Sequence, residues 1–129
     1  MAPKDPRRSL GDRGEALARR HLEECGMRAL ATNYRTPEGE IDLVAADGDT
    51  LVFVEVKLRR GQGFGTPEEA LTPAKRRKLL ANAFAYLQEH GLDDDMTPWR
   101  IDLVAIELDR GGKLLRLDHY PHAVTGDTT

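Results

Sequence analysis

The chain has 129 residues, the length of one ordinary domain, and it is 40% hydrophobic and 32% charged. Its 19 lysines and arginines stand against 22 acids, and the net charge of −3 excludes a uniformly basic nucleic-acid coat and a polybasic membrane anchor. A single cysteine excludes a disulfide framework, and no apolar run is long enough to span a bilayer. The N-terminus has no apolar signal segment, so we expect a soluble cytoplasmic protein without a membrane partner.

The charge is unevenly distributed along the chain. Residues 57–78 hold seven bases and two acids, whereas residues 79–129 hold four bases and nine acids. A mildly acidic protein with such a basic segment can bind a polyanion on one face. Ordinary solvated charge explains the same counts more simply, so composition alone does not select a nucleic acid as the partner.

The elements are predicted in the order helix, three strands, helix, two strands. A first helix is expected from Ser9 or Asp12 to about Cys25, and a second, capped by Thr72, to about His90. Strands are expected over residues 27–35, 40–45, 51–58, 99–108 and 114–120. This order predicts an α/β fold with a mixed central sheet flanked by helices.

Residues 9–124 are expected to form a single domain. Residues 1–8 are predicted to be a flexible N-terminal arm, and residues 125–129 a C-terminal tail. Residues 60–72 are rich in glycine and are predicted to form a loop.

Asp47 and Gly48 lie between two predicted strands and indicate a tight hairpin turn. With these two residues as the turn, Asp42 and Glu55 are diagonal neighbours whose Cβ atoms lie roughly 6–8 Å apart. Because side chains alternate along a strand, Asp42, Glu55 and Lys57 share one face. The other face is apolar and is formed by Ile41, Leu43, Val52, Val54 and Val56.

Two carboxylates this close repel each other by about 2–3 kcal/mol at an effective dielectric constant near 20. A divalent cation offsets that repulsion, and carboxylate oxygens suit Mg²⁺ or Mn²⁺. Lys57 lies two residues beyond Glu55, where it can orient a metal-bound water or stabilise charge developing on a phosphate. A solvated face of an antiparallel hairpin explains the same alternation and is, from the pattern alone, the commoner explanation.

A third carboxylate comes from the first helix. Glu15 and Leu22 are seven residues apart and nearly eclipse, so Glu15 lies at the border of the core-facing surface. Taken alone, Glu15 is better explained as an acid in the first turn that the helix dipole stabilises.

Three motifs together resemble a known family. They are Gly11-x-x-Gly14-Glu15, the stretch from Asn33 to Ala45 with Gly39-Glu40-Ile41-Asp42 at its centre, and Val52-Phe53-Val54-Glu55-Val56-Lys57-x-Arg59. They are similar to the bacterial YraN family, small proteins that resemble archaeal Holliday-junction resolvases of the restriction-endonuclease-like, PD-(D/E)xK, superfamily. The match continues through Lys75-Arg76-Arg77-Lys78 and Arg100-Ile101-Asp102, and covers residues 10 to 124.

The resemblance implies an αβββαβ core and a nuclease centre that uses Mg²⁺ or Mn²⁺. By position, Asp42 and Glu55 would bind the metal, Lys57 would be the catalytic lysine, and Glu15 would complete the site as a further metal-binding acid. The implied activity is phosphodiester hydrolysis in structured or branched DNA during recombination or repair. By analogy with the resolvases, the protein would be a homodimer.

Five basic residues are candidates for contacts with DNA: Arg13, Arg59, Arg60, Lys75 and Lys78. For the two lysines, a solvated helix face is an equally good explanation. The four histidines show no metal-ligand spacing, and Cys25 is expected to be a small buried hydrophobic residue.

Two alternatives to the nuclease remain open on sequence grounds. The protein could be a catalytically silent accessory protein that binds nucleic acid on a nuclease fold. It could also be an interaction module whose clustered acids bind the basic residues of a partner.

Overall fold

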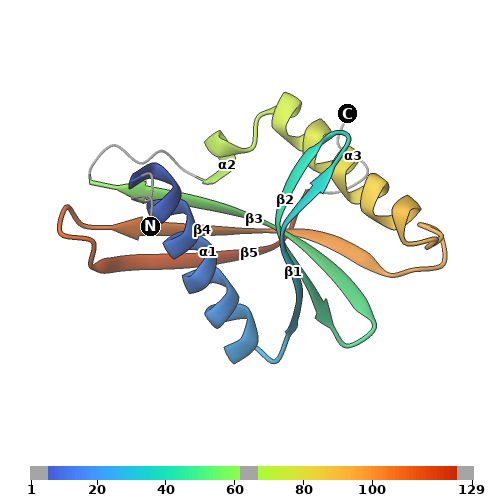
Figure 1. Ribbon diagram of the computed structural model, residues 1–129, viewed down its shortest axis with the longest axis horizontal. Helices are drawn as coiled ribbons and strands as arrows, with labels where there is room; N and C mark the ends of the chain where they lie inside the picture. The colour runs from blue at the N-terminus through green and yellow to red at the C-terminus, as the bar shows by residue number, and fades with distance from the viewer. Residues whose placement is uncertain (1–5, 62–66, 125–129) are drawn as a thin grey trace, which may run out of the picture.

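A five-stranded mixed sheet with helices on both faces forms the protein (Figure 1). The computed structural model describes residues 6–61 and 67–124. The strand order is β1-β2-β3-β4-β5, and every neighbouring pair is antiparallel except β3 and β4, which are parallel. The elements are α1 (Pro6–Glu24), β1 (Arg28–Thr36), β2 (Gly39–Asp47), β3 (Thr50–Arg60), α2 (Pro67–Ala70), α3 (Pro73–Glu89), β4 (Trp99–Leu108) and β5 (Leu114–Val124). The predicted α/β class and element order are confirmed.

The helix boundaries differ from the prediction mainly at the N-terminus. Helix α1 begins at Pro6, so residues 6–8, which were expected in the arm, are helical. Thr72 caps α3 as predicted, since its side chain accepts a hydrogen bond from the Lys75 N–H. The short helix α2 lies within the predicted loop, of which residues 62–66 fall outside the described residues. Residues 1–5 of the arm and the tail also fall outside them.

The parallel pairing of β3 and β4 requires a crossover, which α3 supplies. Because α3 packs on one face of the sheet and α1 on the other, both faces are covered. One apolar cluster joins α1 to the sheet through Ala18, Leu22, Leu43, Val52, Val54, Val104 and Ile106. The other joins α3 to the opposite face through Val44, Phe53, Leu79, Ala83, Leu87, Ile101 and Leu103. Among the described residues no helix is long and apolar enough to cross a membrane.

The hairpin between β2 and β3 turns one residue later than predicted. Asp47 pairs with Thr50, so Gly48 and Asp49 form the turn. Gly48 has φ of +60° and Asp49 is not among the residues with positive φ, the pattern of a turn with glycine at its first central position. The shift moves both strands by one residue and therefore leaves the predicted faces unchanged, except that Ile41 packs in the α3 cluster. In Figure 1, β1 and β2 twist steeply away from β4 and β5.

Candidate active site

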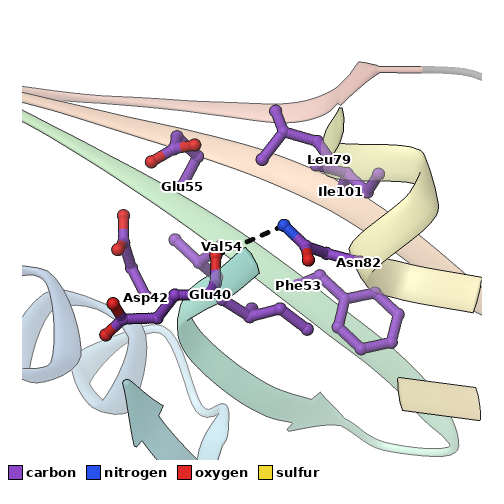
Figure 2. A pocket seen from close by; sticks show the side chains of 9 residues that line it. Glu40, Asp42, Phe53, Val54, Glu55, Leu79, Asn82 and Ile101 are labelled. Carbon is purple, nitrogen blue, oxygen red and sulfur yellow. Dashed lines mark hydrogen bonds between the residues drawn. The ribbon is translucent and has the colours of Figure 1, made fainter. Parts of the chain in front are cut away.

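Asp42 and Glu55 lie beside each other on β2 and β3. Leu43 pairs with Val54, so continuing this register places Asp42 opposite Glu55 rather than diagonal to it. The Val56 N–H donates to Asp42 Oδ2 at 2.8 Å, and the Glu55 carboxyl group lies near enough to act on the pKa of Asp42. Figure 2 shows both carboxyl groups on the same side of the pocket, with apolar side chains behind them.

The environment of these acids disfavours two negative charges. Burial, then the hydrogen bond and the charge of Glu55, raise the pKa of Asp42 from 3.8 to about 8, although the Val56 N–H acts in the opposite direction. Glu55 is itself only 9% exposed. At neutral pH Asp42 therefore holds a proton when no cation is bound.

Lys75, in the first turn of α3, forms an ion pair with Glu55 and so offsets part of the negative charge of the acid pair. Its Nζ lies 2.9 Å from Glu55 Oε2. The sequence prediction placed Lys75 with the DNA-binding residues, but the structure directs it to the acid pair. No local sequence signal could identify this contact, because it depends on how α3 packs across the sheet.

Glu15 reaches the same region from α1. Asn33 Nδ2 donates to Glu15 Oε2 at 2.8 Å, and the charge of Glu15 contributes to the raised pKa of Asp42. Burial in turn raises the pKa of Glu15, against the effect of the Asn33 hydrogen bond. Glu15, Asn33 and Glu40 line a hollow of about 420 Å³ together with Gly11, Asp12 and Arg35. Glu15 therefore lies close enough for its charge to act on Asp42, but it lines a hollow that includes neither Asp42 nor Glu55.

Asn33 is a site residue that the sequence analysis missed. Its φ of +51° is a left-handed conformation inside a strand, which asparagine tolerates better than most residues. Such backbone conformations are concentrated at functional sites. The sequence signal that could have identified this residue is an asparagine in the middle of a predicted strand.

Lys57 follows Glu55 by two residues on β3 and therefore projects from the same face of the sheet. Its side chain is half-buried. Among the residues that the structure describes, Lys57 forms no ion pair, in contrast to Lys75.

The remaining candidate bases lie at separate places on the molecule. The guanidinium groups of Arg13 and Arg60 converge on Gly112, where an added Cβ would lie 2.7 Å from the first and 3.6 Å from the second. Lys78 extends its stem over Gly39, with Cε 3.0 Å from a Cβ placed there. Arg59 is exposed at the end of β3. These residues do not form one continuous strip with Lys75, which is held by Glu55.

The donor set fits a hard divalent cation. Asp42, Glu55 and Glu15 offer only carboxylate oxygens, which Mg²⁺ and Mn²⁺ prefer over nitrogen or sulfur. A cation between Asp42 and Glu55 would also remove the repulsion that a proton and Lys75 now offset.

A second polar cluster lies on the other face of the sheet, around Arg100 and Asp102. Arg100 pairs with the fully buried Asp102 at 3.1 Å. Cys25, on the same side of the sheet, differs from the sequence prediction in its exposure. It is exposed rather than buried, because it follows the last residue of α1 and projects beyond the packed helix.

Comparison with known proteins identifies the family. A sequence profile described as "Uncharacterised protein family UPF0102" matches residues 14–106, which include Glu15, Asp42, Glu55 and Lys57. The chain belongs to this family. UPF0102 proteins of Pelotomaculum thermopropionicum and Roseiflexus castenholzii are 43% and 46% identical over 92% of this chain, and over 98% and 94% of their own. The UPF0102 protein of Rhodococcus opacus is 48% identical over 80% of this chain and 86% of its own. The family assignment drawn from the motifs is therefore confirmed.

Proposed function

We propose that this UPF0102 protein is an endonuclease that depends on Mg²⁺ or Mn²⁺ and hydrolyses structured or branched DNA in recombination or repair. The observation that carries the proposal is the convergence of Asp42 and Glu55 across β2 and β3, with Glu15 beside them and Lys57 on the same face. A buried pair of acids destabilises the fold unless something compensates it, and a bound cation would convert that penalty into a binding site.

Each residue has a distinct role in the proposal. Asp42 and Glu55 hold the cation, for which Asp42 must release its proton, and Asn33 positions Glu15, whose charge acts on Asp42. When bound, the cation would supply Lewis-acid activation of water and of the scissile phosphate. The Lys57 ammonium donates hydrogen bonds to the phosphate and stabilises the charge that develops there during in-line attack.

A second candidate function is supported by the Lys75–Glu55 ion pair. Together with the proton on Asp42, this pair neutralises the acids without any cation. The protein would then bind DNA as an accessory factor without cleaving it. The two candidates differ in whether the acid pair takes up a cation.

Cleavage assays test the nuclease directly. Labelled four-way junctions, flaps, duplexes and single strands are incubated with Mg²⁺ or Mn²⁺ and the wild type, Asp42→Asn or Glu55→Gln. We expect the wild type to cut a branched substrate and each variant to lose about 10²–10³-fold in rate, the size of effect seen when one group that stabilises the transition state is removed. Equal rates in wild type and Asp42→Asn would contradict the assignment.

Calorimetry with Mn²⁺ separates the nuclease from the accessory protein. Lys75 competes with a cation for Glu55, so Lys75→Met is expected to bind Mn²⁺ more tightly, by up to about tenfold for a partly exposed ion pair. Lys78→Met is the matched control, since it lies one turn along α3 and contacts Gly39 instead. Absence of Mn²⁺ uptake by wild type and Lys75→Met, even with junction DNA present, would leave the accessory role.

A further inference from the structure

Three nitrogen and sulfur side chains converge where α1 ends, on the face of the sheet opposite the acid pair. His21 belongs to α1, Cys25 follows it by four residues, and His119 belongs to β5. His21 Nε2 lies 3.1 Å from His119 Nδ1 and 3.6 Å from Cys25 Sγ. All three candidate ligand atoms lie within 4.8 Å of one another.

The buried Asp102 fixes the orientation and the tautomer of His119. His119 Nε2 lies 2.8 Å from Asp102 Oδ2, and the same carboxylate accepts from Arg100 Nε and from the His122 N–H. Since the carboxylate accepts, His119 Nε2 carries the hydrogen, and the lone pair of Nδ1 points toward His21 and Cys25. A carboxylate behind a histidine in this way is the usual support of a metal-binding imidazole.

Two of the three ligand separations match those of a tetrahedral metal centre. Zinc–nitrogen bonds of about 2.0–2.1 Å and zinc–sulfur bonds of about 2.3 Å place neighbouring ligands about 3.3 Å apart for two nitrogens and about 3.6 Å apart for nitrogen and sulfur. The structure has 3.1 Å and 3.6 Å for these separations. Little rearrangement is therefore needed for an ion to bind.

We propose that His21, Cys25 and His119 form a Zn²⁺ site, supported from behind by Asp102. Imidazole and thiolate ligands select zinc and related transition metals rather than Mg²⁺. Cys25 is exposed, so the fourth coordination position faces solvent and is open to water or to an external ligand.

The Zn²⁺ site is separate from the proposed nuclease centre. Asp102 shares a face with Val104, which packs under α1, whereas Glu55 shares a face with Phe53, which packs under α3. The two sites also differ in ligand chemistry. A bound zinc would tie the end of α1 to β5, and its binding does not depend on catalysis by the acid pair.

Titration of the full chain with Co²⁺, a spectroscopic substitute for zinc, tests the proposal. We expect a thiolate-to-cobalt charge-transfer band and the visible bands of tetrahedral Co²⁺, and we expect Zn²⁺ to abolish both. Cys25→Ser and His21→Asn should lose the bands and weaken binding by more than the about 10–100-fold typical of changes behind the ligands. Asp42→Asn and His90→Asn are controls that should keep the bands.

Thermal unfolding provides the second readout. Zn²⁺ should raise the unfolding midpoint of the wild type but not that of Cys25→Ser, whose exposed side chain makes misfolding an implausible cause. Absence of the charge-transfer band would mean that His21 and His119 are only hydrogen-bonded to each other, and would overturn the proposal. So would bands that survive in Cys25→Ser but disappear in Asp42→Asn.

Discussion

Buried acids in this protein are stabilised in two different ways. Asp102 is fully buried and has enough donors, because Arg100, His119 and the His122 N–H all point at it. Asp42 and Glu55 instead lie beside each other on neighbouring strands, with Lys75 paired to Glu55 and the Val56 N–H donating to Asp42. Among the described residues no buried side-chain nitrogen or oxygen lacks a partner, so the difference lies in charge rather than in hydrogen bonding. Of these two sets of buried acids, the Asp42–Glu55 pair is the one whose negative charge a cation could balance.

The raised pKa of Asp42 makes stability depend on pH. Its pKa rises from 3.8 to about 8 on folding, so between these values the folded state binds more protons than the unfolded state. The free energy of unfolding therefore falls as pH rises from about 4 to about 8. Asp42→Asn removes this dependence, so the free energy of unfolding of the variant relative to the wild type is expected to increase by on the order of 2–4 kcal/mol between pH 4 and pH 9. The full pKa shift, at about 1.4 kcal/mol per pKa unit, would give a larger value, but Glu55 and Lys75 readjust.

Urea unfolding at several pH values without added metal measures this gain. Asp49→Asn is the matched control, because Asp49 is exposed in the turn of the same hairpin, and it should change stability by less than about 0.5 kcal/mol. A constant difference between Asp42→Asn and wild type from pH 4 to pH 9 would show that Asp42 does not titrate in this range.

Among the elements, α1 determines whether Glu15 reaches the site. Gly14 is buried against β3, and a Cβ placed on it would lie 3.3 Å from Leu58 Cδ2. This close approach brings the next residue, Glu15, to Asn33 on β1. The glycine was recognised in the sequence motif, but its packing partner follows only from the fold.

Enlarging Gly14 should therefore displace α1. Gly14→Val is expected to lower the free energy of unfolding by about 1–3 kcal/mol through overpacking and to weaken the Glu15–Asn33 contact. Gly11→Val is the matched control, since a Cβ at Gly11 meets nothing within 4 Å. Denaturant unfolding of both variants, with metal affinity as a second measurement, checks this prediction. Equal losses in the two variants would mean that helix propensity, not the contact with Leu58, is responsible.

Across the whole molecule, the charge is balanced overall but separated locally. The net charge is −3, yet Arg13 of α1 and Arg60 of β3 meet at the turn between β4 and β5. Lys57 and Arg59 lie on the same strand as Arg60, downstream of Glu55. A phosphate backbone could bind at this basic patch, and any such binding would weaken steeply with salt.

Arg13→Gln/Arg60→Gln is expected to weaken binding of junction DNA and to reduce the slope of log affinity against log salt by up to about 2, at about 0.9 per phosphate contact. Arg19→Gln/Arg28→Gln removes the same charge from the later part of α1 and from the start of β1, and should change the slope little. Fluorescence anisotropy over a range of salt concentrations gives both slopes. Equal reductions in the two double variants would indicate a nonspecific effect of net charge.

Local rules of sequence were sufficient to predict several features of the fold and of the candidate site. Strand alternation placed Asp42, Glu55 and Lys57 on one face, helix capping located α3, and the order of elements gave the α/β class. These predictions succeeded because side-chain periodicity and capping depend on residues close in the chain. The exact register was wrong because either Asp47-Gly48 or Gly48-Asp49 can form a two-residue turn.

The contacts between elements follow from the packing of the folded chain. Lys75 reaches Glu55, Asn33 holds Glu15, and His119 meets His21, over separations in the chain that no local pattern spans. Each contact depends on which face of the sheet a helix covers and on how steeply the strands twist beneath it. Packing therefore decides which charges are paired, and this pairing determines where a cation can bind.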